Sequence, residues 1–194
     1  MTPKMLRDGM FNIHTRRFGT VTELMIKRLA TLGKSRNQFH DLYDDVKNHR
    51  VEVKFSTVRR KNARPIREDT VLDCIKNELA MNRSVKFAEW RDAKFDCNIQ
   101  QVKRAEFDVL YYGLFFSDAI LIFKIHPHEI DASIQYSDKQ HKGNKGEGQF
   151  HITQNNLDIH LKRFLHTKLT YQELLQLLDG ATAPEVSDIR GPGR

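Results

Sequence analysis

Three residues of this chain carry the chemical groups that phosphodiester hydrolysis requires. Asp41 and Glu52 supply carboxylates, and Lys54 supplies an ammonium group two residues after Glu52. The reaction needs a divalent cation that neutralises charge on the phosphate and activates water. It also needs a nearby base or cation that orients this water. Because Mg²⁺ takes hard oxygen ligands, usually one or two carboxylates with water and phosphate, we expect Mg²⁺ as the cofactor.

The alternation of residue types predicts the strands that would position these groups. Residues 50–56 alternate apolar and polar side chains, which predicts a strand with Glu52 and Lys54 on one face. Residues two apart on a strand lie about 7 Å apart on the same side. Residues 38–45 predict a preceding strand that ends in acidic residues. A hairpin of these two strands would bring Asp41 beside Glu52.

An acid followed two residues later by lysine is a weak motif, because this chain contains it three times. The three copies are Asp45-Val-Lys47, Glu52-Val-Lys54 and Asp92-Ala-Lys94. Only the second has apolar neighbours on both sides and an acidic strand upstream. The alternative interpretation is an ordinary solvent-facing Glu/Lys pair, since antiparallel pairs commonly have one polar face. Asp44 and Asp45 also remain alternatives to Asp41 as the first metal ligand.

The charge of the chain favours a polyanionic partner. Its 194 residues include 32 Lys and Arg against 25 Asp and Glu, a formal net charge of +7. Residues 54–67 contain six basic residues and no acidic one. This stretch leaves the catalytic strand directly, so we expect part of it to contact DNA phosphates. The residues expected to do so are Arg59, Arg60, Lys61 and Arg64. A basic enzyme without a nucleic-acid partner is the alternative.

Two polar segments are candidates for reading DNA sequence. Gln and Asn can pair two-pronged with adenine, and Lys can contact guanine, in the major groove. The first segment contains Gln100, Gln101 and Lys103, and the second contains Lys139, Gln140, His141, Lys142 and Asn144. The alternatives are side-chain hydrogen bonding at a strand end for the glutamines, and a flexible solvated turn for the glycine-rich second segment.

The remaining patterns predict a mixed sheet with helices packed against it, an α/β (α+β) fold. A helix is expected from Thr20, and another opens at 69–70 with Val71, Ile75 and Leu79 on its inner side. Residues 107–116 and 119–125 predict a buried hairpin. Two helices are expected to close the chain, capped by Thr153 and Thr170. We expect one nuclease domain over 1–180 and a loosely held tail over 181–194.

Several classes of protein are excluded by composition. No apolar run approaches the roughly 20 residues of a membrane span, and no signal peptide is visible at the N-terminus. Two cysteines, Cys74 and Cys97, cannot form a disulfide framework and suit a cytoplasmic protein. His126-Pro-His128-Glu129 lacks further ligands at metal-binding spacing and is interpreted as a surface turn.

The predicted hairpin resembles the catalytic hairpin of the PD-(D/E)XK nuclease superfamily, above all of type II restriction endonucleases. The resemblance lies in Phe39-His-Asp-Leu-Tyr and Arg50-Val-Glu-Val-Lys-Phe-Ser56, and in the later segments 98–103, 107–116 and 120–123. It spans about residues 18–125 and implies a restriction-endonuclease-like mixed central sheet flanked by helices. The chain departs from the pattern before Asp41, where His40 stands in place of the usual proline.

The resemblance also implies roles for individual residues. Asp41 and Glu52 would bind Mg²⁺, the main-chain carbonyl of Val53 would be a further ligand, and Lys54 would position the attacking water. Glu23 would be an additional acid on the first helix. The alternative for Glu23 is a capping box with Thr20, in which its side chain bonds back to the start of the helix.

Together these expectations describe a Mg²⁺-dependent endonuclease that cleaves double-stranded DNA at specific sites, within a restriction system that has a separate methyltransferase. A structure-selective repair, recombination or phage nuclease is one alternative, and a non-catalytic DNA-binding protein is another. Cutting both strands of a palindrome requires two sites, which favours a homodimer. Its interface is expected on the first helix or on the C-terminal helices, through Leu157, Leu161, Phe164, Leu174, Leu175 and Leu178.

Overall fold

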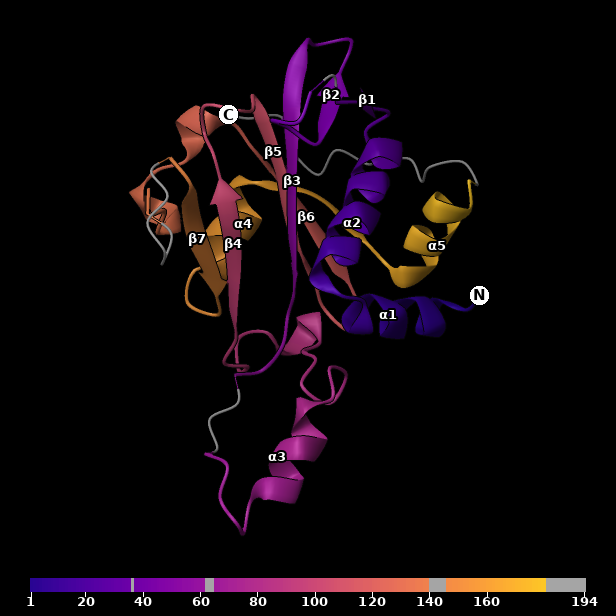
Figure 1. The fold of residues 1–194 in the computed structure, drawn as a ribbon, viewed down its shortest axis with the longest axis vertical. Helices are drawn as coiled ribbons and strands as arrows, with labels where there is room; N and C mark the ends of the chain where they lie inside the picture. Colours follow the sequence, from indigo (N-terminus) through magenta and orange to yellow (C-terminus); the bar gives the residue numbers. More distant parts are fainter. Residues whose placement is uncertain (36, 62–64, 140–145, 181–194) are drawn as a thin grey trace.

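A six-stranded mixed sheet forms the centre of the molecule (Figure 1). The computed structural model describes residues 1–35, 37–61, 65–139 and 146–180. The strand order is β1-β2-β3-β5-β6-β8, with β3 and β5 parallel and every other pair antiparallel. The strands are β1 (Gly33–Lys34), β2 (Leu42–Asp44), β3 (His49–Thr57), β5 (Val109–Phe115), β6 (Ile120–Ile125) and β8 (Leu165–Leu169). The mixed α/β class expected from the sequence is therefore confirmed.

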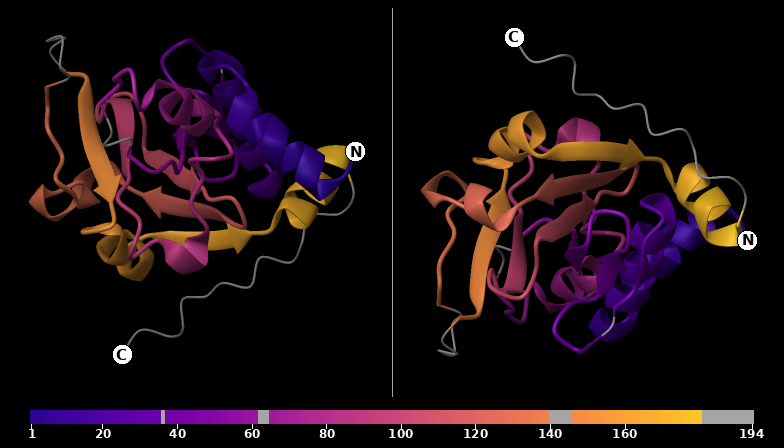
Figure 2. Two further views of the ribbon diagram at one scale, coloured as in Figure 1. Left: turned by 90° about the horizontal axis from the view of Figure 1, so that it is seen from below. Right: turned by 90° about the horizontal axis from the view of Figure 1, so that it is seen from above.

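The two faces of this sheet are covered by different layers (Figure 2). Helices α1 (Pro3–Asn12), α2 (Thr15–Leu29) and α5 (Tyr171–Asp179) pack on one face, around a core that includes Met25, Val53 and Leu174. The other face is covered by an antiparallel pair, β4 (Asp96–Val102) and β7 (Gly148–Thr153), with helix α4 (Leu157–Arg163). Among the described residues, none of the helices has the length and apolar character needed to span a bilayer.

The central strands β5 and β6 form the buried hairpin that the sequence predicts. All residues of β5 are buried, because its side chains are apolar on both faces. Gly113 lies where two elements approach β5 closely. A Cβ atom on this residue would lie 2.2 Å from the carbonyl oxygen of Leu121 and 2.3 Å from the ring of Phe55. Only glycine therefore fits at this position.

The first helical region differs from the prediction. The chain forms α1, and α2 then begins at Thr15 rather than at Thr20. The hydroxyl of Thr20 donates to the carbonyl of Arg16, 3.3 Å away, one turn earlier in the same helix. Glu23 therefore lies in the middle of α2, and the predicted capping box at Thr20 is wrong.

The C-terminal region contains a strand that the sequence analysis missed. Strand β8 lies between α4 and α5 and pairs with the edge of β6. Thr153 does not cap α4, which begins after Asn156, although the two residues are hydrogen-bonded. The capping box of Thr170 and Glu173 at the start of α5 is confirmed, and Gly180 ends that helix in the left-handed conformation. The predicted tail over 181–194 lies outside the described residues.

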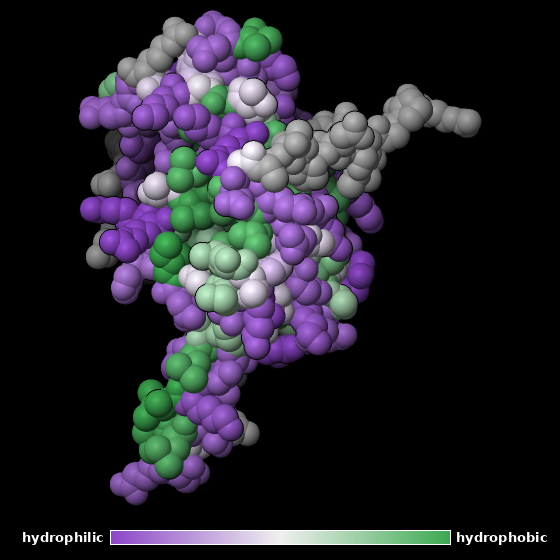
Figure 3. Space-filling model, turned by 90° about the vertical axis from the view of Figure 1, so that its right-hand side faces the viewer, coloured by the Kyte–Doolittle hydropathy of each residue, from purple (hydrophilic) through white to green (hydrophobic). Residues whose placement is uncertain are grey.

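Helix α3 (Val71–Glu78) projects away from the sheet (Figure 1), and apolar residues form much of the surface of this projection (Figure 3). Leu72, Ile75 and Leu79 are 78%, 60% and 63% exposed. Cys74 is the buried residue of this helix. The helix begins after Thr70 as expected, but the predicted inner side formed by Ile75 and Leu79 is wrong, because no layer of the fold reaches it.

Among the residues that the structure describes, three short 3₁₀ turns lie in the connections. They are Phe87–Glu89 before β4, and Pro127–Glu129 and Ala132–Ile134 between β6 and β7. The turn at Pro127 is closed by Glu129, whose carboxylate accepts the main-chain N–H of His126 at 2.8 Å. The motif His126-Pro-His128-Glu129 is therefore a capped turn at the end of β6.

Candidate active site

Asp41 lies directly before the first residue of β2, beside the longer strand β3. Its main-chain N–H donates to the carbonyl of Val51 at 3.1 Å, which continues the pairing of the hairpin by one residue. Its carboxylate then accepts the N–H of Val53 at 2.9 Å. The side chain of Asp41 thus accepts the hydrogen bond that a main-chain carbonyl of β2 would accept if that strand were longer. This bond holds the Asp41 carboxylate against the strand that carries Glu52 and Lys54.

The ammonium group of Lys54 lies near both carboxylates of the predicted triad. Its Nζ is 2.5 Å from Oε1 of Glu52 and 3.8 Å from Oδ2 of Asp41. The side chains of Lys54 and Glu52 are 24% and 12% exposed, so this pair is largely shielded from water. The structure therefore brings the three residues together, as the hairpin pattern predicts.

The electrostatic environment separates the protonation states of these groups. Burial raises the pKa of Glu52 to about 7, with a further contribution from Asp41, although Lys54 acts in the opposite direction. Burial alone would lower the pKa of Lys54, but Glu52 and Asp41 outweigh it and the pKa is raised. Lys54 therefore remains a cation at neutral pH, while Glu52 titrates near it.

Glu23 of α2 is electrostatically linked to the same site. Burial raises the pKa of Glu23, the Asp41 carboxylate raises it further, and Lys54 lowers it. Because α2 begins at Thr15, Glu23 is not part of its N-terminal cap. Glu23 therefore lies on α2 within electrostatic reach of Asp41 and Lys54, and the role that the resemblance implies for it stays a prediction.

The triad opens into a cavity of about 230 Å³ between β3 and the loop after β4. Four carboxylates line it, those of Asp41, Glu52, Glu106 and Glu147, against the two ammonium groups of Lys54 and Lys103. Lys103 lies 3.6 Å from both Glu106 and Glu147. A cavity with an excess of acid on a protein of net charge +7 has the charge needed to attract a cation.

Gln101 lines this cavity with a strained main chain. Its φ of 58° is in the left-handed region, and the pairing of β4 with β7 shifts register between Ile99 and Val102. Such an irregularity redirects side chains away from the strand pattern. Gln101 and Lys103, predicted to contact DNA, therefore lie beside the triad, whereas Gln100 does not line the cavity.

The two alternative first ligands occupy other positions. Oδ1 of Asp44 accepts the main-chain N–H groups of Val46 and Lys47 at 3.1 and 3.0 Å, which closes the hairpin turn. The carboxylate of Asp45 lies against Gly33, where an added Cβ would be 2.5 Å from it. Neither residue lines the cavity, so the geometry favours Asp41.

The donor set suits Mg²⁺ in its chemistry. Within the described ranges, no group of three or more His, Cys, Asp or Glu side chains is arranged to hold a metal ion. Asp41 and Glu52 nevertheless supply two carboxylates on one cavity, and one or two are usual for Mg²⁺. In the structure, the main-chain N–H of Val53 donates to the carboxylate of Asp41. The role that the resemblance implies for Val53 is a different one, in which its main-chain carbonyl is a ligand of Mg²⁺.

The predicted phosphate contacts lie at the far end of β3 from the triad and already have protein partners. Arg59 donates to the carbonyl of Phe11 at 2.6 Å. Arg60 is 3.1 Å from Glu89, and Lys61 is 3.0 Å from Asp96. At about 3.3 Å per residue, Arg60 lies roughly 20 Å along the chain from Lys54. Arg64 lies outside the described residues.

The second predicted reading segment is only partly described. Lys139 is exposed, and its main chain exchanges hydrogen bonds with the hydroxyl of Ser137, each at 3.2 Å. Gln140, His141, Lys142 and Asn144 lie outside the described residues. Their predicted contact with DNA therefore stays a prediction.

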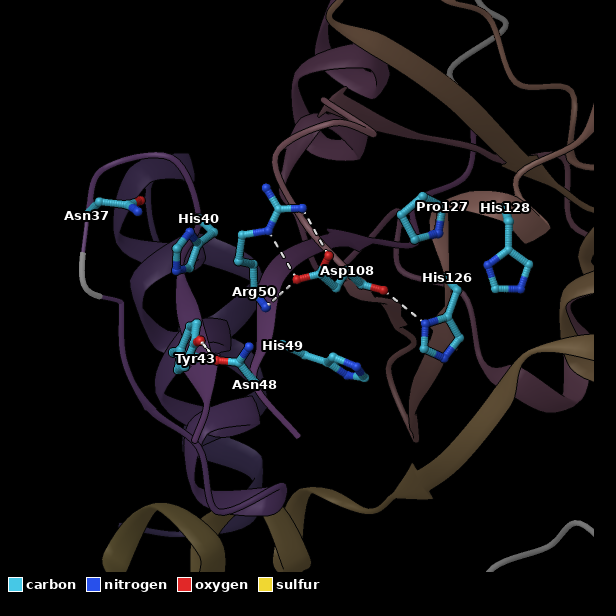
Figure 4. Close-up of a pocket in the computed structure, with 10 residues that line it drawn as sticks. All are labelled: Asn37, His40, Tyr43, Asn48, His49, Arg50, Asp108, His126, Pro127 and His128. Atoms are coloured by element: carbon cyan, nitrogen blue, oxygen red, sulfur yellow. Dashed lines mark hydrogen bonds and ion pairs between the residues drawn. The ribbon is translucent and has the colours of Figure 1, made fainter. Parts of the chain in front are cut away.

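Sequence reasoning missed a larger cavity of about 790 Å³ next to the triad (Figure 4). Four histidines line it, His40, His49, His126 and His128, together with the Arg50–Asp108 ion pair. His40 also lines the cavity of the triad, so the two cavities share a wall. The available signal was the histidine on each side of Pro127. The proximity of this turn to His49 depends on the pairing of β3 with β5 and of β5 with β6.

Comparisons with family models, with curated proteins and with solved structures find no match to this chain.

Proposed function

We propose that this protein is a Mg²⁺-dependent endonuclease of double-stranded DNA, with a fold of the restriction-endonuclease type. The observation that carries the proposal is the position of Lys54, 2.5 Å from Glu52 and 3.8 Å from Asp41 at an acidic cavity. A protein that only binds DNA has no need of two largely shielded acids around a lysine in such a cavity. This feature favours hydrolysis over simple binding.

The residues divide the chemistry of hydrolysis among them. Asp41 and Glu52 would hold Mg²⁺, which when bound stabilises negative charge on the phosphate and lowers the pKa of water. Lys54 stays protonated, so it orients the attacking water and the phosphate as a hydrogen-bond donor rather than as a base. The water oxygen forms a new bond to phosphorus and gives up a proton to solvent. The P–O bond to the leaving oxygen breaks, and the leaving oxygen takes up a proton from solvent.

Site-specific cleavage in a restriction system, beside a separate methyltransferase, is the proposed biological setting. Gln101 and Lys103 support it, because they place groups that can read bases beside the triad. A structure-selective nuclease with the same triad remains the alternative. The two differ in products, since a site-specific enzyme gives discrete fragments and a structure-selective enzyme does not.

A homodimer is proposed because one triad cuts one strand. Of the six apolar residues expected at its interface, Leu157, Phe164 and Leu174 are buried in the core of the single chain. Leu175 and Leu178 instead line an apolar groove of about 500 Å³ formed with α1 and α2. Sedimentation with and without DNA should show a dimer in the cutting state. A monomer that cuts both strands in one event would contradict this arrangement.

The test of the proposed function is digestion of a supercoiled plasmid with Mg²⁺ and with EDTA. Cleavage should require Mg²⁺ and should be lost in Glu52→Ala and in Lys54→Ala, while both variants still bind DNA. Asp44→Asn is a matched control, because that acid closes the turn outside the cavity. Discrete bands would support restriction, and wild-type rates in either triad variant would overturn the assignment of the site.

A further inference from the structure

The histidine-lined cavity has two walls that come from distant parts of the chain (Figure 4). One wall is the β2–β3 hairpin, with His40, Tyr43 and Asn48. The other is the turn after β6, with His126 and His128. Its volume of about 790 Å³ is within the range of small-molecule binding sites.

Flat rings dominate this cavity. The rings of His126 and His128 are nearly parallel, with centroids 5.6 Å apart and planes at 17°. The ring of His49 meets His126 edge-on, at 6.2 Å and 81°. Pro127, between the two histidines in sequence, restricts the main chain of the turn that carries them. Together they form a preformed aromatic surface against which a planar ligand can stack.

A buried group in the shared wall lacks its hydrogen-bond partners. His40 is 6% exposed, and neither of its ring nitrogens has a partner in the described structure. A neutral imidazole offers one donor and one acceptor, and leaving both unpaired in the interior costs free energy. A ligand that offers both kinds of group would satisfy this ring after a small rotation.

The charges of the cavity disfavour a simple anion. Its guanidinium, Arg50, is bound to Asp108 by bonds of 2.9 and 3.0 Å and also donates to the carbonyl of Ala105. That ion pair holds the pKa of Asp108 at about 2, so it remains intact at neutral pH. Among the described residues that line the cavity, these two charges cancel each other. The ligand that fits is planar and polar, with donors and acceptors on its edge, rather than strongly charged.

We propose that this cavity binds a single nucleobase, held out of its stack, from the strand whose backbone passes the triad. The proposal rests on the proposed nuclease function, because the DNA strand bound at the triad would supply the base. Arg50 and Glu52 are two residues apart on one face of β3, so the cavity begins roughly 7 Å from the triad. His40 lies between the two cavities, next to Asp41. A nucleotide beside the cleaved bond can therefore reach the cavity, where aromatic stacking tolerates any base.

The first experiment uses full-length protein in EDTA and a series of duplexes, each with one mismatched pair. Extruding a mismatched base from the duplex costs less free energy than extruding a paired one. A mismatch at the extruded position should therefore tighten binding by about tenfold, whereas a mismatch at other positions should not. His49→Ala and His128→Ala should lose this gain. His14→Ala is the matched control, since His14 is exposed at the start of α2 and makes no capping bond.

The second experiment does not depend on cleavage. Adenosine 5′-monophosphate, inorganic phosphate, a single-stranded oligonucleotide and the mismatched duplex are titrated separately while the ring C–H signals of the histidines are followed by NMR. The nucleotide should shift signals of His126 and His128 in a saturable way, and phosphate should not. A stronger response to the oligonucleotide than to the mismatched duplex would identify single strands as the source of the base.

The outcomes separate this proposal from the nuclease assignment. Mg²⁺-dependent cleavage with no mismatch gain and no nucleotide shift would overturn the base site and leave the nuclease intact. A nucleotide shift in a protein that does not cut DNA would overturn the nuclease and retain the base site. Equal shifts with phosphate and nucleotide would show an anion site, and a mismatch gain that survives in His128→Ala would place the base elsewhere.

Discussion

The carboxylate of Asp41 accepts the main-chain N–H of Val53 at 2.9 Å, so the first acid of the site is bound to the strand that carries the other two groups. The bond forms because β2 begins only at Leu42, while β3 continues beyond Val51, the residue opposite Leu42, and this leaves the N–H of Val53 without a partner on β2. The separation of Asp41 from Lys54 therefore depends on the length of the hairpin as well as on side-chain rotamers.

This relationship predicts different effects for two substitutions of Asp41. Asp41→Asn keeps an acceptor for the Val53 N–H but removes the charge, so cleavage should fall by at least about a hundredfold with little loss of stability. Asp41→Ala should also lower the free energy of unfolding by about 1 kcal/mol, because the hydrogen bond is lost. Single-turnover cleavage and urea unfolding measure the two effects. An active Asp41→Asn beside an inactive Asp44→Asn would move the metal site to Asp44.

The local parts of this site were predictable from the sequence. Alternation around Glu52 and Lys54 sets both on one face of a strand, and this periodicity is a property of the extended chain. The strand predicted over 38–45 is shorter in the structure, where β2 covers only Leu42–Asp44, and Asp41 is held beside β3 by its hydrogen bonds to Val51 and Val53. The buried strand β5 was predictable from its continuous apolar run, and α5 from its capping box at Thr170.

The missed parts depend on tertiary structure. Strand β8 follows α4 so closely that its leucines continue a helical pattern, and only the free edge of β6 makes it a strand. Helix α3 has an amphipathic sequence that predicts a buried face, yet the fold offers no surface to cover Ile75. The histidine cavity joins residues from β2, β3 and the end of β6, and no local spacing reveals that register.

The raised pKa of Glu52 predicts a pH dependence for Mg²⁺ binding. Below a pKa of about 7 the carboxyl group is protonated, so binding Mg²⁺ must displace a proton. Mg²⁺ affinity should therefore fall about tenfold per pH unit below 7 and level off above it. Calorimetric titration of Mg²⁺ from pH 5.5 to 8.5 measures this. Glu52→Gln should bind weakly with a flat profile, and a flat profile in the wild type would contradict the assignment of Glu52 as a ligand.

The basic residues 59–61 are expected to have two different roles, in DNA binding and in stability. The salt dependence of DNA binding can test this. Arg60 and Lys61 lie in exposed ion pairs, which contribute little to stability and can be exchanged for phosphate contacts. Each single alanine substitution should reduce the log–log salt slope of DNA binding by about one. Arg59→Ala should instead destabilise the fold, because its guanidinium holds the carbonyl of Phe11. Arg7→Ala, in a local pair with Asp8, is the control. Unchanged slopes in Arg60→Ala and Lys61→Ala would remove these residues from the DNA interface.

The core pair of Tyr112 and His160 predicts how the protein responds to acid. The Tyr112 hydroxyl is 2.8 Å from Nδ1 of His160, and burial lowers the pKa of that histidine to about 4. Since the unfolded chain binds a proton near pH 6.5, this group's contribution to stability is complete above pH 6.5. It is lost as the pH falls toward 4. By this linkage the loss reaches about 3 kcal/mol at the low end.

Urea unfolding at pH 7.5 and pH 4.5 tests this contribution. His160→Gln cannot take up the proton, so its free energy of unfolding should change less between the two pH values than that of the wild type. His151→Gln is the control, because His151 is partly exposed and paired with Asp96 on the second sheet. Equal acid sensitivity in the wild type and in His160→Gln would show that other groups, and not the buried imidazole, govern the loss of stability below pH 6.5.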